Sequence, residues 1–60
     1  MHITTRQAEI VKHLLKGKSN SEIAQTMNIS VLTVKSQLTH IYKEYNVKSR
    51  LQLMYKLTKN

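Results

Sequence analysis

Residues 19–47 contain two short helical patterns that are joined by a tight polar turn. Ser19 and Glu22 open the first pattern, because a Ser N-cap and an acid three residues later can satisfy each other's free N–H groups. Asn28 marks the turn, since Asn tolerates the left-handed backbone that a sharp turn requires. Ser30 then caps a longer helix. The spacing predicts a helix-turn-helix, with helices over about 20–27 and 31–45.

The longer of these two helices has an apolar side and a polar side. Its apolar residues recur with a period of 3.6 residues, which excludes a strand: Val34, Leu38, Ile41, Tyr42 and Tyr45. The opposite side carries Leu32, Ser36, Thr39, His40 and Lys43, with Lys35 on its flank. Because this side is mostly polar and positively charged, it suits the floor of a DNA major groove.

Two further helices are predicted, over about 4–16 and 49–58. Thr4 and Gln7 have the spacing of a capping box, as do Ser49 and Gln52. Gly17 suits the C-terminal end of the first helix. The buried stripe of the first helix is predicted to consist of Ala8, Val11, Leu14 and Leu15, with Ile10 beside it. The fourth helix carries a broad apolar arc that includes Leu51, Leu53, Met54, Tyr55 and Leu57.

Length and composition fit one all-α domain. Sixty residues allow a single domain, and a chain with no Pro and one Gly has little room for strands joined by tight turns. The predicted fold is therefore a compact four-helix domain over residues 1–60 that contains the helix-turn-helix. The sequence leaves open whether these residues are a whole protein or part of a larger one.

The charge of the chain favours a polyanion as its partner. Ten Lys and Arg residues oppose three Glu, for a net charge of +7, and six of the basic residues lie at or after Lys35. The absence of Cys and of a signal peptide or membrane-length apolar run agrees with a cytoplasmic, nucleoid-associated protein and gives no sign of a membrane partner.

The chain resembles a known family over nearly its whole length. The matching segments are ITTRQAEIV (3–11), GKSNSEIA (17–24), ISVLTVKSQLTHIYKEYNV (29–47) and KSR (48–50). Together they resemble the DNA-binding domain of LuxR-type (GerE-type) transcriptional regulators of bacteria. Region 4 of sigma factors shares the E-I-A and T-V-K elements, but it lacks the V-x-S-R that starts a helix after the recognition helix.

Four positions depart from the family pattern. Thr5 stands in place of a frequent Pro, Gln7 of a frequent Glu, Gln37 of a frequent His and Asn46 of a frequent Gly. Asn46 is a mild change, because Asn also tolerates a positive φ at a helix C-terminus. Gln37 borders the turn, so phosphate contacts near it are expected to differ from those of the family.

The resemblance implies sequence-specific binding of double-stranded DNA by a transcription regulator. It also implies a weak homodimer through the fourth helix, and RNA polymerase is a further candidate partner. Resemblance and helix geometry together predict these DNA-binding residues: Asn20, Ser21, Ser30, Thr33, Lys35, Ser36, Thr39, His40, Lys43 and Lys48. The predicted dimer interface consists of Leu51, Met54, Tyr55 and Thr58. For Arg50 the sequence leaves two interpretations open: it contacts phosphate, or it takes part in helix capping or lies in solvent.

Two other classes of function compete with DNA binding. A protein-interaction module would dock through the fourth helix and barely touch DNA. A basic amphipathic peptide on a membrane surface is disfavoured, because three separate capping signals indicate a compact fold.

Catalysis and metal binding find little support in the sequence. The three Glu residues are explained as caps or surface charges, and the chain has no Asp. His2, His13 and His40 lack the spacing of metal ligands, and His13 is placed on the polar side of the first helix. We therefore expect no enzymatic activity, no cofactor, no metal and no small-molecule ligand in this segment.

Overall fold

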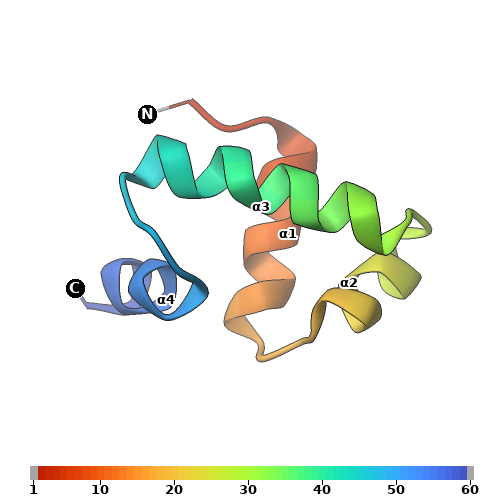
Figure 1. Ribbon diagram of the computed structural model, residues 1–60. Helices are drawn as coiled ribbons and strands as arrows, with labels where there is room; N and C mark the ends of the chain where they lie inside the picture. Colours follow the sequence, from red (N-terminus) through yellow and green to blue (C-terminus); the bar gives the residue numbers. More distant parts are fainter. Residues whose placement is uncertain (1, 60) are drawn as a thin grey trace.

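The computed structural model describes residues 2–59, which form four helices. These are α1 (Thr5–Leu15), α2 (Asn20–Met27), α3 (Val31–Tyr45) and α4 (Arg50–Thr58). The all-α class and the four predicted helices are confirmed. Positions 1 and 60 of the predicted domain lie outside the described residues. α3 runs across one side of the molecule, with α1 behind it and α2 and α4 below its two ends (Figure 1).

The helices begin where the capping pattern predicts. Thr4 and Gln7 exchange backbone-to-side-chain hydrogen bonds of 3.0 Å in both directions, and Ser19 and Glu22 do the same at 2.8 and 3.1 Å. Two predicted helices begin one residue earlier than observed, because the ranges 4–16 and 49–58 include the N-cap residues Thr4 and Ser49. The first range also includes the C-cap residue Lys16. At α4 the box is incomplete: the Ser49 hydroxyl accepts from the Gln52 amide, but Gln52 Oε1 accepts from the amide of Lys48.

Three helix ends use a left-handed residue to reverse the chain. Gly17, Asn28 and Asn46 have φ values of +84°, +57° and +56°. The next residue in each case donates back into the last turn, as when the amide of Ile29 donates to the carbonyl of Ala24 at 3.0 Å. Asn28 thereby sets the sharp turn between α2 and α3, and Asn46 adopts the left-handed conformation expected at its position.

The core is a single apolar cluster to which all four helices contribute. Its buried members are Ile10, Val11, Leu14, Ile23, Ala24, Val34, Leu38, Ile41 and Leu53. On α2 the buried residues are Ile23 and Ala24, and the stripe predicted for α3 is confirmed at Val34, Leu38 and Ile41.

The stripe predicted for α1 is partly wrong. Ala8 and Leu15 are exposed, Leu15 by 39%, whereas Ile10 is fully buried. At about 100° per residue, the stripe that includes Ile10, Val11 and Leu14 points in one direction, and Ala8 and Leu15 lie roughly 100° away from its centre. The larger side chain of Ile10 gives this stripe more apolar surface to bury than Ala8 would supply.

No helix within residues 2–59 has both the length and the apolar character that crossing a membrane requires.

Candidate nucleic-acid interface

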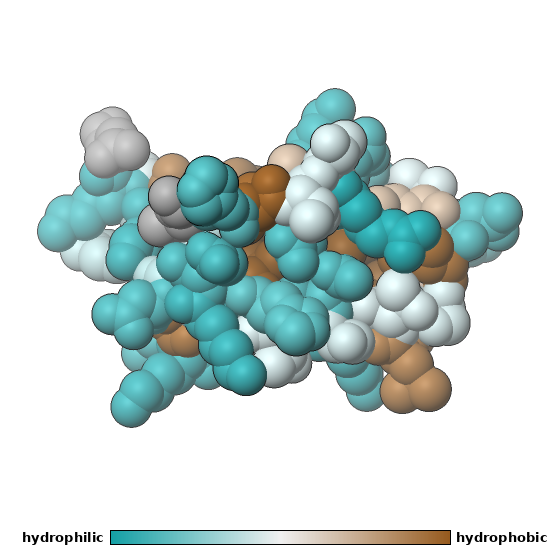
Figure 2. All heavy atoms as spheres, turned by 90° about the horizontal axis from the view of Figure 1, so that it is seen from above, coloured by the Kyte–Doolittle hydropathy of each residue, from teal (hydrophilic) through white to brown (hydrophobic). Residues whose placement is uncertain are grey.

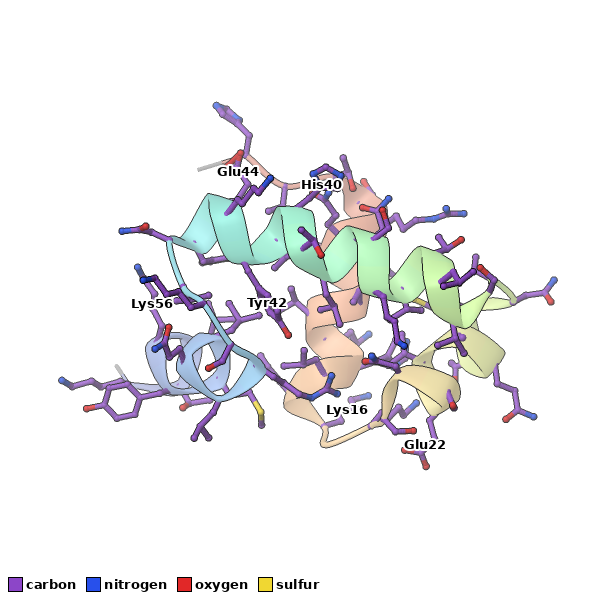
Figure 3. All side chains as sticks on the ribbon, viewed as in Figure 1. Lys16, Glu22, His40, Tyr42, Glu44 and Lys56 are labelled. Carbon is purple, nitrogen blue, oxygen red and sulfur yellow. The ribbon has the colours of Figure 1, made fainter. Side chains whose placement is uncertain are left out.

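The outer side of α3 is a polar, cationic surface that faces away from the core. Lys35, Ser36, Thr39, His40 and Lys43 are all exposed, as predicted from the helical projection. Seen from above, the face that carries α3 is covered largely by hydrophilic side chains (Figure 2). Figure 3 shows His40 on this outward side of α3, while Tyr42 points from the opposite side toward the rest of the domain.

The hydroxyl groups of Ser30 and Thr39 already make hydrogen bonds within the chain, which determines what each can still bind. The Ser30 hydroxyl accepts from the amide of Thr33 at 3.0 Å, and the two hydroxyl oxygens lie 2.9 Å apart. Ser30 therefore caps α3, and Thr33 is half-buried beside it. The Thr39 hydroxyl donates to the carbonyl of Lys35 at 3.1 Å, so its oxygen remains an acceptor toward a ligand.

A hollow of about 590 Å³ opens where the α1–α2 loop, the start of α2 and the start of α3 meet. It brings together three of the predicted DNA-binding residues, namely Asn20, Ser21 and Lys35. Lys18, Arg50 and Glu22 also line it, so its rim carries three cationic side chains against one carboxylate. The bonds from Ser19 lower the pKa of Glu22, which keeps this acid in its capping role.

Arg50 connects α4 to the rim of this hollow through hydrogen bonds. One guanidinium nitrogen donates to Asn20 Oδ1 at 2.9 Å, and the other donates to the carbonyl of Lys18. Both partners lie about thirty residues earlier in the chain, which no local pattern indicates. The sequence did not predict this contact between Arg50 and the α1–α2 region, and a phosphate contact by Arg50 stays a prediction. Lys56 makes a second contact between helices, because its ammonium donates at 2.7 Å to the carbonyl of Tyr45, the last residue of α3.

Replacing Arg50 by Ala is expected to lower the free energy of unfolding by about 1–3 kcal/mol, since it leaves two half-buried acceptors without their charged donor. Urea denaturation followed by circular dichroism measures this. Arg6→Ala, at an exposed position of α1, is the matched control and should change stability by less than about 0.5 kcal/mol. Equal stabilities for the two variants would contradict a structural role for Arg50.

A second hollow, of about 460 Å³, lies on the other side of α3. His40 and Lys43 line it together with Glu44 and the N-terminal segment around His2 and Thr4. His40 and Lys43 thus line one hollow, and Asn20, Ser21 and Lys35 line the other, so the two hollows flank the outer side of α3. Lys48 is exposed in the α3–α4 loop, at the opposite end of α3 from Ser30.

The outer side of α4 carries an apolar stripe. Leu51 and Tyr55 are 77% and 62% exposed, and Thr58 is exposed on the next turn. Met54, the fourth residue of the predicted dimer interface, is half-buried and packs against the core. Lys59 Nζ lies 5.2 Å from the centre of the Tyr55 ring. Three of the four predicted residues therefore share one exposed face.

The model of the luxR family of bacterial regulatory proteins matches residues 1–57 of the chain. The chain belongs to this family. Among its relatives is the CsgBAC operon transcriptional regulatory protein of Escherichia coli, which is 44% identical over 83% of the chain and 23% of the relative. The oxygen regulatory protein NreC of Staphylococcus carnosus is 40% identical over 87% of the chain and 24% of the relative.

The nitrate/nitrite response regulator protein NarP of Escherichia coli is 37% identical over 82% of the chain and 23% of the relative. The chain thus spans about a quarter of the length of these relatives. No solved structure matches it at a significant level. The luxR family is a class of regulatory proteins and not a class of enzymes. Among residues 2–59, no three His, Cys, Asp or Glu side chains come together as metal ligands.

Two departures from the luxR-family pattern are in contact in this chain. Gln7 Nε2 donates to Gln37 Oε1 at 2.9 Å, in a half-buried bond that joins α1 to α3. The side chain of Gln37 is thus engaged with α1, and the expected difference in phosphate contacts near it stays a prediction. A neutral amide pair therefore stands where the family pattern has a frequent Glu and a frequent His.

His13 is a structural residue that the sequence misplaced. Its side chain is only 12% exposed, so it does not lie on an open polar side of α1. Lys18 Nζ lies 3.2 Å from His13 Nδ1, and Glu9 Oε2 lies 3.9 Å from Nε2. Burial and the nearby charge of Lys18 lower the pKa of His13, so the neutral ring is the form that the fold favours.

Stability should therefore fall on mild acidification. A His whose pKa is lowered in the fold stabilises it fully above pH 6.5, its ordinary pKa, and this contribution is lost as pH falls below that value. Urea denaturation between about pH 5 and pH 7.5 should show a smaller loss for His13→Gln than for the parent. His40→Gln, on the outer side of α3, controls for removing one imidazole. Parallel profiles for His13→Gln and the parent would contradict this prediction.

Proposed function

We propose that this domain binds double-stranded DNA in a sequence-specific manner, with α3 in the major groove, as part of a bacterial transcription regulator at the nucleoid. The observation that carries the proposal is the outer side of α3, where polar and cationic side chains stand exposed on a helix whose opposite side packs in the core. Membership of the luxR family supports it, as do relatives named as regulators of transcription or of a response.

Phosphate contacts are assigned to the cationic and capping groups around α3. Lys35 reaches the groove edge from the rim of the larger hollow, with Ser21 beside it. Asn20 offers its amide protons to a phosphate oxygen, because Arg50 already occupies its carbonyl. The free amides of the first turn of α3, after Ser30, are suited to a further phosphate, with Thr33 beside them. Lys43 and Lys48 extend these contacts toward the C-terminal end of α3.

Base contacts are assigned to the side chains at the centre of the outer face. Ser36 and Thr39 lie about one turn apart on exposed positions, and His40 lies beside them. Because the Thr39 hydroxyl proton is engaged with Lys35, Thr39 presents an acceptor, which suits the amino group of cytosine or adenine. Ser36 both donates and accepts, so alone it discriminates weakly between bases.

A homodimer through α4 completes the proposal. Leu51, Tyr55 and Thr58 form one exposed stripe with large apolar side chains, and Met54 supports it from the core. Two copies joined along this stripe would place two α3 helices on successive major grooves. Sequences selected from a random DNA library should then contain inverted half-sites about one helical turn apart. A single asymmetric site would contradict the dimer while leaving the DNA contacts of one copy intact.

Variants on the outer face separate base contacts from phosphate contacts. Ser36→Ala or Thr39→Ala should weaken binding to the selected sequence by about 1–3 kcal/mol and leave binding to scrambled DNA unchanged. Lys43→Ala should weaken both equally and reduce the salt slope by about one unit. Binding isotherms on the two duplexes, with circular dichroism as a check on folding, measure these effects.

Lys35→Ala is expected to lose the most affinity. If this variant and the three others bound DNA like the parent, α3 would not be the recognition helix. The exposed stripe of α4 would then favour the competing function, a protein-interaction module.

A further inference from the structure

Leu32 has a large apolar side chain that is exposed to solvent in this fold. It lies in the first turn of α3 and is 76% exposed, whereas its neighbour Val31 packs against the core. The core cluster does not include Leu32. Ile29 and Val34 already have the spacing of a hydrophobic staple around the Ser30 cap, and both pack in the core. Leu32 therefore has no packing role that explains its apolar side chain.

Leu32 shares the outer face of α3 with the residues assigned to DNA. Lys35 and Ser36 follow it by three and four positions, which places them one turn further along the same side of the helix. Leu32 is the one apolar member of this group of exposed residues, which otherwise consists of Lys35, Ser36, Thr39, His40 and Lys43. It also lies at the N-terminal end of α3, the end that makes base contacts in helix-turn-helix proteins.

An aliphatic side chain has one complementary group on the base edges of the major groove, the C5 methyl of thymine. The hydroxyls of Ser36 and Thr39 discriminate weakly, so a methyl contact would add selectivity that they lack. We infer that Leu32 is a specificity-determining residue that packs on a thymine methyl in each half-site. This inference rests on the proposed function, since it requires α3 to lie in the major groove.

The surroundings of Leu32 favour DNA over a protein partner. A docking surface for a protein generally presents a contiguous apolar patch of several hundred Å². Leu32 is instead bordered by Ser30, Lys35 and Ser36, and Lys35 supplies positive charge that complements a polyanion. The other strongly exposed apolar side chains, Leu51 and Tyr55, lie on α4, near the opposite end of α3 (Figure 1).

Replacement of thymine by deoxyuridine tests the inference, because it removes the methyl and keeps the hydrogen-bonding groups. The probe is the duplex that the parent protein selects from a random library, with its thymines replaced one position at a time. At one position per half-site, the parent should bind the deoxyuridine duplex about fourfold more weakly, as expected for one lost methyl contact. Leu32→Ala should bind the two duplexes equally.

Leu15→Ala is the matched control, because Leu15 is also an exposed leucine but lies on α1, outside the residues assigned to DNA and to the dimer. Whatever its overall affinity, this variant should keep the fourfold dependence on the methyl. The inference is overturned if Leu32→Ala keeps the same dependence as the parent, or if no single replacement affects the parent. Failure of the proposed function has a different signature, because the parent would then select no sequence from the library at all.

Discussion

Replacing Leu38 by Ala is expected to leave the chain largely unfolded in water. Leu38 is 4% exposed and lies at the centre of the apolar side of α3, where it belongs to the core shared by all four helices. Truncating a buried Leu costs about 2–5 kcal/mol, and a core of this size rarely supplies more than about 3–5 kcal/mol. The loss is therefore comparable to the whole stability of the domain.

Thermal unfolding followed by circular dichroism measures this effect, and α3 provides its own control. Leu32→Ala removes the same atoms from the same helix at a position that is 76% exposed, so its stability should lie within about 0.5 kcal/mol of the parent. If Leu38→Ala melted cooperatively near the parent midpoint, the apolar side of α3 would be assigned to the wrong residues.

Binding to DNA is expected to depend steeply on salt. If about four to six Lys and Arg residues contact phosphates, the logarithm of the binding constant should fall with the logarithm of salt concentration at a slope of about −4 to −5 per monomer. A fourfold rise in salt would then weaken binding by a factor on the order of several hundred. The cationic side chains around α3, including Lys35 and Lys43, are the expected source of this slope.

A titration on random duplex DNA measures the slope, because phosphate contacts do not require a particular sequence. Lys12→Ala is the control, since Lys12 is exposed on α1 and lies outside the residues assigned to DNA. It should leave the slope unchanged. A slope near zero for the parent would count against DNA as the partner and in favour of the interaction module.

Local sequence patterns predicted most of the fold, because the features that define the helices depend mainly on residues close together in the chain. The capping boxes at Thr4 and Ser19 and the turn at Asn28 each depend on residues within four positions of one another. The stripe of α3 was also predicted correctly, since fifteen residues contain enough turns to define one direction. On α1, the sequence permitted two overlapping stripes, and only packing decided that Ile10 points inward and Leu15 does not.

Contacts between distant residues were the part that the sequence did not reveal. Arg50 meets Asn20 and the carbonyl of Lys18 because α4 folds back onto the α1–α2 loop. The contact between Lys18 Nζ and His13 Nδ1 depends on the same loop. At the candidate site, periodicity predicted which residues of α3 are exposed, but it did not show that Lys35 lines one hollow whereas His40 and Lys43 line another.

The claim that α3 is the DNA-binding element is tested most directly by amide chemical shifts of the ¹⁵N-labelled domain during titration with its selected duplex. The largest changes should occur along the outer side of α3, at Leu32, Ser36 and Thr39, and at the start of α2, around Asn20. Any dimer formed on DNA should add changes at the outer stripe of α4. Shifts confined to α4, with those of α3 unmoved at saturation, would contradict the account.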